Sequence, residues 1–186
     1  MITYKRPTTI GQLLTNYKHL ALSKTREHVK GMSGPCGRCA LCGNHGKHNK
    51  SMVRCVSQII GKSKTFPLNQ KLTCAKYGIY AATCVICHER YVGQTKNKFS
   101  TRWSSPRSNW NGPNCEFDEN NKHKVALLRH FSESHGDVSK PPIHEAYTVT
   151  FVEEPNSPSL DFCEDKWHHR LNAQINIQNM ILLRVR

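Results

Sequence analysis

Hydrophobic and polar residues alternate in some parts of the chain and recur at helical spacing in others. Alternation predicts a hairpin over residues 51–67, a second hairpin within 71–95, and a later strand over 146–153. Spacing of three and four residues predicts helices over residues 10–22, 97–103, 122–134 and 160–171. Because antiparallel hairpins are mixed with helices, we expect an α+β fold with a small central antiparallel sheet flanked by helices.

Changes in composition divide the chain into three parts. Residues 1–34 form a basic lead-in, which either holds the helix expected over 10–22 or serves as a linker. Residues 35–70 hold a cysteine-rich stretch and the first hairpin, and residues 71–186 are expected to form the main domain. The stretch PCGRCALCGNHGKHNK has no periodic pattern, so we expect it to fold only around a metal ion, as an N-terminal zinc-stabilised module.

The charge balance narrows the class of partner. The 186 residues include 27 Lys and Arg against 13 Asp and Glu, which gives a formal net charge of +14. A chain this basic binds polyanions, among which nucleic acid is the commonest. No run approaches the roughly 18 apolar residues of a membrane-spanning helix, and the first residues lack the apolar stretch of a secretory signal. We therefore expect an intracellular protein without a membrane partner.

Nine cysteines are more than an intracellular chain usually carries, and an odd number without a secretory signal argues against a disulfide framework. Cys36, Cys39 and Cys42 lie at the two-residue spacing of zinc ligands. The fourth ligand is ambiguous among four residues, namely Cys74, His45, His48 and Cys55. We favour Cys74, since a thiolate suits zinc and the return of the hairpin could bring it close.

A second pair of cysteines, Cys84 and Cys87, has the same spacing. His130 and His135 lie downstream at a spacing found in zinc-binding histidine pairs. On a continuous helix these two rings would diverge, so they can share an ion only if the helix ends near Ser134, as Gly136 favours. The sequence therefore predicts a second structural zinc ion, which would fasten the hairpin to the following helix.

The most specific motif is Gly78-Ile79-Tyr80, followed after ten intervening residues by Tyr91-Val92-Gly93. With an arginine and a glutamate downstream, this pair of tripeptides resembles the GIY-YIG endonuclease family. The resemblance implies that the tripeptides lie on adjacent antiparallel strands, and that their tyrosines meet an arginine, a glutamate and a late asparagine at one catalytic site. The corresponding residues in this chain are Tyr80, Tyr91, Arg102, Glu164 and Asn179.

The chemistry of phosphodiester hydrolysis suggests a role for these residue types. The planar guanidinium of Arg102 would bind the negative charge that develops on the phosphoryl oxygens. Glu164 would hold Mg²⁺ or Mn²⁺. Tyr80, with Tyr91 nearby, is our hypothesis for the base, although a phenol needs neighbouring cations for that role. Pro106 stands where many relatives carry a histidine, and His88 or Lys96 could take over that role.

The Cys84-x₂-Cys87 pair between the two tripeptides resembles the endonucleases of Penelope-like retroelements, as do the upstream cysteines and the spacing of Glu164 and Trp167. This narrower resemblance covers about residues 36–186. It implies a nuclear enzyme that nicks double-stranded target DNA, so that an associated reverse transcriptase domain can copy the element RNA from the freed 3′ end. The chain itself has no reverse transcriptase motif.

Basic residues follow the second tripeptide, and those expected to contact DNA phosphates are Lys96, Lys98 and Arg107. Two other functions stay open. One is a homing, restriction or repair nuclease of the same fold, which the cysteine pair between the tripeptides disfavours. The other is a non-catalytic, zinc-stabilised DNA-binding protein.

Overall fold

The computed structural model describes residues 31–37, 39–43, 51–104, 106, 110, 122–155 and 160–176. In chain order its strands and helices are β1 (Met32–Ser33), β2 (Gln58–Ile60), β3 (Thr65–Pro67), β4 (Lys71–Leu72), β5 (Gly78–Cys84), β6 (Arg90–Thr95), α2 (Phe99–Arg102), α4 (Lys122–Ser134), α5 (Ile143–Ala146), β7 (Tyr147–Glu153) and α6 (Leu160–Leu171). Within these ranges, none of the helices has the length and apolar character that crossing a membrane requires.

The central sheet consists of three antiparallel strands in the order β6-β5-β7. Tyr80 on β5 lies opposite Gly93 on β6 and Phe151 on β7. β2 and β3 form a separate antiparallel hairpin, and β1 pairs with β4 in parallel. The fold is therefore mixed α/β with small antiparallel sheets, as the hydrophobic pattern predicts.

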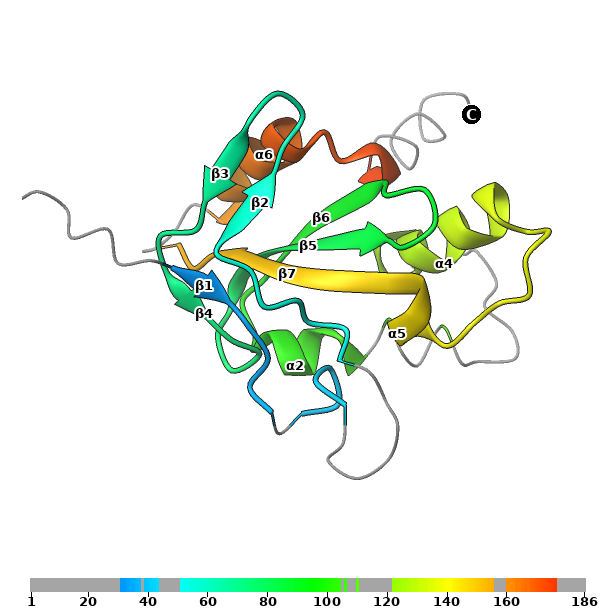
Figure 1. The fold of residues 1–186 in the computed structure, drawn as a ribbon, viewed down its shortest axis with the longest axis horizontal. Coiled ribbons are helices and arrows are strands. Elements are labelled where there is room, and N and C mark those ends of the chain that lie inside the picture. The colour runs from blue at the N-terminus through cyan, green and yellow to red at the C-terminus, as the bar shows by residue number, and fades with distance from the viewer. Residues whose placement is uncertain are drawn as a thin grey trace, which may run out of the picture.

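Each face of the central sheet has its own hydrophobic core. On one face, Ile79 and Val92 pack with the buried side of α6 and with the β2–β3 hairpin. On the other face, Tyr80 and Tyr91 pack with residues of α2 and α4. Figure 1 shows α6 and the β2–β3 hairpin on one side of the central sheet and α2 on the other. Residues of the cysteine-rich stretch, such as Leu41, belong to the second core as well.

Gly78, the first glycine of the tripeptide motifs, has a structural task. Its φ of 123° lies in the region that favours glycine, and the pairing of β5 with β7 shifts register just after it, between Ile79 and Tyr80. A Cβ at this position would lie 2.2 Å from the carbonyl oxygen of Glu153. The glycine therefore lets β5 begin with an irregularity that sets the register of Tyr80.

The second hairpin, the helix over 122–134, the helix over 160–171 and the later strand are confirmed, with boundaries that agree within a few residues. The first hairpin is present but shorter than expected, because its first strand begins at Gln58 rather than at residue 51. The helix expected over 97–103 is present as the shorter α2. The β1–β4 pair and α5 are not predicted, because elements of two to four residues carry too little pattern. The helix expected over 10–22 lies outside the described residues.

Candidate active site and metal-binding clusters

Antiparallel pairing of β5 and β6 brings the two motif tyrosines together. Tyr80 lies opposite Gly93 and Tyr91 lies opposite Ala82, so both side chains leave the sheet on the same face. Their ring centroids are 6.2 Å apart, and both side chains are buried. A Cβ at Gly93 would lie 2.7 Å from the hydroxyl oxygen of Tyr80. The second motif glycine therefore provides the space that the Tyr80 hydroxyl occupies.

The short helix α2 carries Arg102 to the same tyrosines. Two aromatic residues anchor this helix: Phe99 stacks on Phe151 at 4.2 Å between ring centroids, and Trp103 packs edge-on against Tyr80 at 5.6 Å. Arg102 itself is half-buried. Its positive charge and its hydrogen bonding both act on the Tyr80 hydroxyl.

Glu164 reaches these residues from α6, the helix that covers the opposite face of the sheet. This is possible because β6 is an edge strand of the sheet and α6 packs mainly against it. Glu164 is half-buried, and its charge acts on both Tyr80 and Tyr91. Together, Tyr80, Tyr91, Arg102 and Glu164 form what we call the candidate active site, at the edge of β6.

Burial dominates the electrostatics of the candidate active site. Loss of solvent raises the pKa of Tyr80, and the nearby charge of Glu164 raises it further, while Arg102 opposes the shift. Burial likewise raises the pKa of Tyr91. Both hydroxyls are therefore protonated at neutral pH. Burial also raises the pKa of Glu164, against the effect of a hydrogen bond from Gln94.

An asparagine that the sequence analysis missed holds the β6 edge in place. The side-chain amide of Asn176 donates a hydrogen bond to the Val92 carbonyl oxygen and accepts one from the Val92 N–H, both at 2.8 Å. These groups belong to the residue after Tyr91. The predicted Asn179 lies outside the described residues, and no local signal separates Asn172, Asn176 and Asn179 in the sequence.

The other predicted residues near the site are distributed around it. Lys96 and Lys98 are exposed between β6 and α2. Arg107 lies outside the described residues. Pro106 is half-buried, and His88 lies in the turn between β5 and β6.

A group of four thiols, here called the upstream cluster, consists of Cys36, Cys39, Cys42 and Cys74. The sulfur of Cys42 lies 3.7 Å from that of Cys36, 3.6 Å from that of Cys39 and 3.1 Å from that of Cys74. A tetrahedron with metal–sulfur bonds of zinc length has edges of about 3.8 Å. Cys74, the favoured fourth ligand, lies in this cluster, whereas Cys55 contacts the sulfur of Met32. The other two candidates, His45 and His48, lie outside the described residues.

The second group, here called the hairpin cluster, consists of Cys84, Cys87, His130 and His135. The Cys84 sulfur lies 3.5 Å from Nε2 of His135, and the Cys87 sulfur lies 3.4 Å from Nε2 of His130. Thiolate and imidazole ligands of one tetrahedral zinc ion would be separated by about 3.6 Å. As predicted, α4 ends at Ser134, so the two rings converge. Each cluster could therefore hold a structural metal ion.

Neighbouring groups favour the metal-binding forms of His130 and Cys84 in the hairpin cluster. Nδ1 of His130 lies 3.5 Å from a carboxylate oxygen of Glu89 and 3.4 Å from the hydroxyl of Ser134, which leaves Nε2 for an ion. Burial disfavours the thiolate of Cys84, but hydrogen bonds from His130 and from the backbone outweigh it and lower the pKa of Cys84 to about 6. A thiolate is the form that binds metal.

The described part of the chain thus combines two possible metal-binding clusters with a separate group of two tyrosines, an arginine and a glutamate. Comparison of the chain with family models, with curated proteins and with solved structures finds no match. A functional interpretation therefore depends on the sequence motifs and on the contacts described above.

Proposed function

We propose that this chain is a DNA endonuclease with a GIY-YIG fold that uses a divalent metal ion to hydrolyse one phosphodiester bond. The observation that carries the proposal is the meeting of Tyr80, Tyr91, Arg102 and Glu164 at the β6 edge, from four separate elements. The formal charge of +14 supports DNA as the substrate. Its place in a Penelope-like retroelement, in the nucleus beside a reverse transcriptase domain and element RNA, is part of the same proposal.

In the proposed reaction, water attacks the phosphorus atom, the bond to the 3′ oxygen breaks, and the products are a 5′-phosphate and a 3′-hydroxyl. Negative charge grows on the phosphoryl oxygens during this step. Arg102 would bind that charge in a half-buried setting, where a fixed cation acts more strongly than it does in water. The 3′-hydroxyl is the end that a reverse transcriptase could extend.

Glu164 is the residue that would hold Mg²⁺ or Mn²⁺. Such ions commonly bind one or two carboxylates and complete their shell with water and substrate phosphate, so a single half-buried glutamate fits. When bound there, the ion would supply positive charge to the scissile phosphate and to the nearby hydroxyls.

Tyr80 is proposed as the base that accepts a proton from the attacking water, with Tyr91 beside it. Because burial raises the pKa of Tyr80, the hydroxyl keeps its proton in the free protein. Arg102 is the side chain whose charge opposes that shift. The role of base therefore depends on a gain of positive charge near the hydroxyl when the substrate is bound.

We further propose that the upstream cluster and the hairpin cluster each hold Zn²⁺. Both offer four protein ligands and leave no position for water, which is the arrangement of structural zinc sites. In the hairpin cluster the ion would join the turn between Tyr80 and Tyr91 to α4. It would thereby fix the two strands on which the tyrosines lie.

The test is nicking of a supercoiled plasmid by the purified chain with Mg²⁺ or Mn²⁺. Wild type should produce relaxed circles whose 3′ ends a polymerase extends. Glu164→Ala and Arg102→Ala should each lower the rate by a factor of about 10²–10³ without loss of zinc or folding. Arg54→Ala, which removes an exposed arginine outside the candidate active site, is the matched control and should stay within a few-fold of wild type.

The same test separates a nuclease from a non-catalytic protein. A homing or repair nuclease of this fold would also lose activity in both variants, so this result supports a nuclease of either kind. A non-catalytic DNA-binding protein would bind the plasmid in its wild-type form and leave it supercoiled. Near-normal cleavage by Tyr80→Phe would remove the proposed base while leaving the nuclease proposal intact.

A further inference from the structure

A groove of about 310 Å³ lies between three segments that are distant in the sequence. One wall is the turn of the β2–β3 hairpin, the second is the β5–β6 turn with the start of β6, and the third is the C-terminal end of α6. We call it the hairpin–helix groove. It is distinct from the candidate active site, because Arg90 in the groove and the neighbouring Tyr91 point to opposite faces of β6.

The walls of the hairpin–helix groove are joined by hydrogen bonds. The guanidinium of Arg90 donates to the carbonyl oxygen of Ile60, which ties β6 to the hairpin. The backbone N–H of Lys62 donates to the carbonyl oxygen of Arg170 at 3.1 Å, which ties the hairpin turn to α6. A concave surface that is already held in shape loses little conformational freedom when it binds a ligand.

Positive charge dominates the lining of this groove. Lys62 is exposed and Arg90 is half-buried, and neither forms an ion pair with an acidic residue in the part of the chain that the structure describes. Glu89 also lines the groove, and its carboxylate lies 3.5 Å from Nδ1 of His130 in the hairpin cluster. The two cations outnumber this one carboxylate, so the net charge of the three side chains is positive, which favours an anion.

Polar side chains at unusual backbone positions complete the lining. His88 has a φ of 62° and Asn172 has a φ of 51°, a region in which glycine is the least strained residue. Both line the groove, from opposite walls. Gln174 adds a half-exposed amide. At these positions the chain carries hydrogen-bonding side chains instead of glycine, and such groups bind phosphate and sugar oxygens.

We propose that the hairpin–helix groove binds a backbone phosphate of the DNA duplex, next to the phosphate that is cleaved. This inference rests on the proposed function, and it names a second contact with the same substrate. Arg90 and Tyr91 are consecutive residues of one edge strand, so the groove and the candidate active site lie on the two faces of that strand, and a duplex bound beside it could contact both. Lys62 and Arg90 supply charge to the phosphate, and Gln174 supplies a neutral donor.

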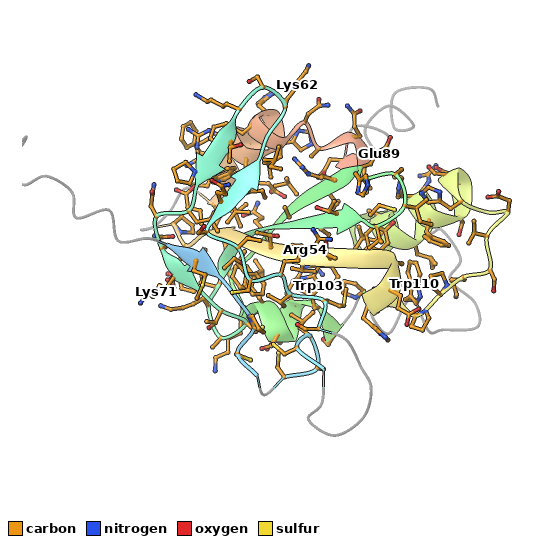
Figure 2. The ribbon with its side chains drawn as sticks, in the orientation of Figure 1. Arg54, Lys62, Lys71, Glu89, Trp103 and Trp110 are labelled. Atoms are coloured by element: carbon orange, nitrogen blue, oxygen red, sulfur yellow. The ribbon has the colours of Figure 1, made fainter. Side chains whose placement is uncertain are left out.

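The experiment measures affinity for a fluorescent DNA duplex over a series of NaCl concentrations, without added Mg²⁺, so that no cleavage is needed. The variants are Lys62→Ala and Gln174→Ala. The matched control is Lys71→Ala, an exposed lysine on β4. Figure 2 shows Lys62 at the tip of the β2–β3 hairpin and Lys71 well away from it.

Loss of one phosphate contact lowers the slope of log affinity against log salt by about 0.9 and weakens binding by about eightfold at 0.1 M salt. Lys62→Ala should show this change, while Lys71→Ala should match wild type. Gln174→Ala should weaken binding and keep the wild-type slope, because it removes no charge. An unchanged slope for Lys62→Ala, or an equal loss for Lys71→Ala, would overturn the proposal, as would a wild type that does not bind DNA.

The outcome is separable from that of the nuclease proposal. If Lys62→Ala lowers the slope but the wild type never nicks a plasmid, phosphate binding in the groove is supported and the proposed enzymatic activity is refuted. If the wild type nicks DNA and Lys62→Ala binds with the wild-type slope, the nuclease proposal is supported and phosphate binding in the groove is refuted.

Discussion

Replacing Gly93 with alanine would place a methyl group between the two tyrosines of the candidate active site. The added Cβ would lie 2.7 Å from the Tyr80 hydroxyl oxygen, 2.7 Å from Cε1 of Tyr91 and 2.8 Å from Cζ of Tyr80. Ordinary contacts between such atoms begin near 3.5 Å, so the rings would have to move by about 0.7–0.8 Å. Tyr80 has little room to do so, because Phe99 and Trp103 pack against its ring.

The size of the effect follows from this crowding. Overpacking of a buried site usually costs about 1–3 kcal/mol of unfolding free energy. For a chain of this length, each kcal/mol lowers Tm by about 2–4 °C, so Gly93→Ala should lower Tm by about 2–12 °C. A shift of nearly 1 Å in catalytic groups costs about 10²-fold in rate, so plasmid nicking should fall by about that factor.

Gly34→Ala is the matched control for this variant. A Cβ at Gly34 would meet nothing closer than the Cys55 sulfur at 3.9 Å, which is an ordinary contact. Thermal unfolding and plasmid nicking are to be measured for both variants beside wild type. If Gly93→Ala unfolds at the same temperature as Gly34→Ala and nicks DNA as fast, the packing argument for the two tyrosines is refuted.

Three further predictions address the edge strand, the carboxylate and the clusters. Asn176→Ala removes two hydrogen bonds to the backbone of β6, and urea unfolding should show a loss of about 1–3 kcal/mol; an unchanged midpoint would contradict this. The negative charge of Asp165 helps burial to raise the pKa of Glu164. Asp165→Asn should therefore lower the pKa of Glu164 and move the acidic limb of the pH–rate profile for nicking to lower pH. A shift of that limb to higher pH would refute this prediction. Elemental analysis should find two zinc ions per chain in wild type and in Cys55→Ser, whose residue lies outside both clusters. Cys84→Ser should retain one zinc ion. Equal zinc content in all three proteins would rule out zinc in the hairpin cluster.

Local periodicity predicted the elements that bury a continuous stripe of side chains. Cys163, Trp167 and Leu171 recur at helical spacing, and all three are buried where α6 packs on the sheet. The β1–β4 pair could not be found in this way. Ser33 is a polar residue that the sequence would leave at the surface, yet it is fully buried because its hydroxyl accepts a hydrogen bond from the backbone N–H of Phe151.

The candidate active site and the clusters could be proposed where residues of fixed chemistry recur at short spacing. Tyr80 and Tyr91 lie on the two strands of one hairpin, and Cys84 and Cys87 lie at the end of β5 and in the turn that follows it. Asn176 was missed because its contact with Val92 joins residues 84 positions apart, and nothing near it in the sequence marks that contact. The hairpin–helix groove was missed for the same reason, since its three walls meet only in the folded chain.

The most direct test of the central claim is the rate at which saturating protein converts supercoiled plasmid to relaxed circles with Mg²⁺ in a single turnover. The account predicts that wild type does so and that Glu164→Gln is slower by a factor of about 10²–10³, with unchanged Tm, zinc content and DNA affinity. Equal rates for the two proteins, or a folded, zinc-loaded wild type that binds the plasmid and leaves it intact, would contradict the account.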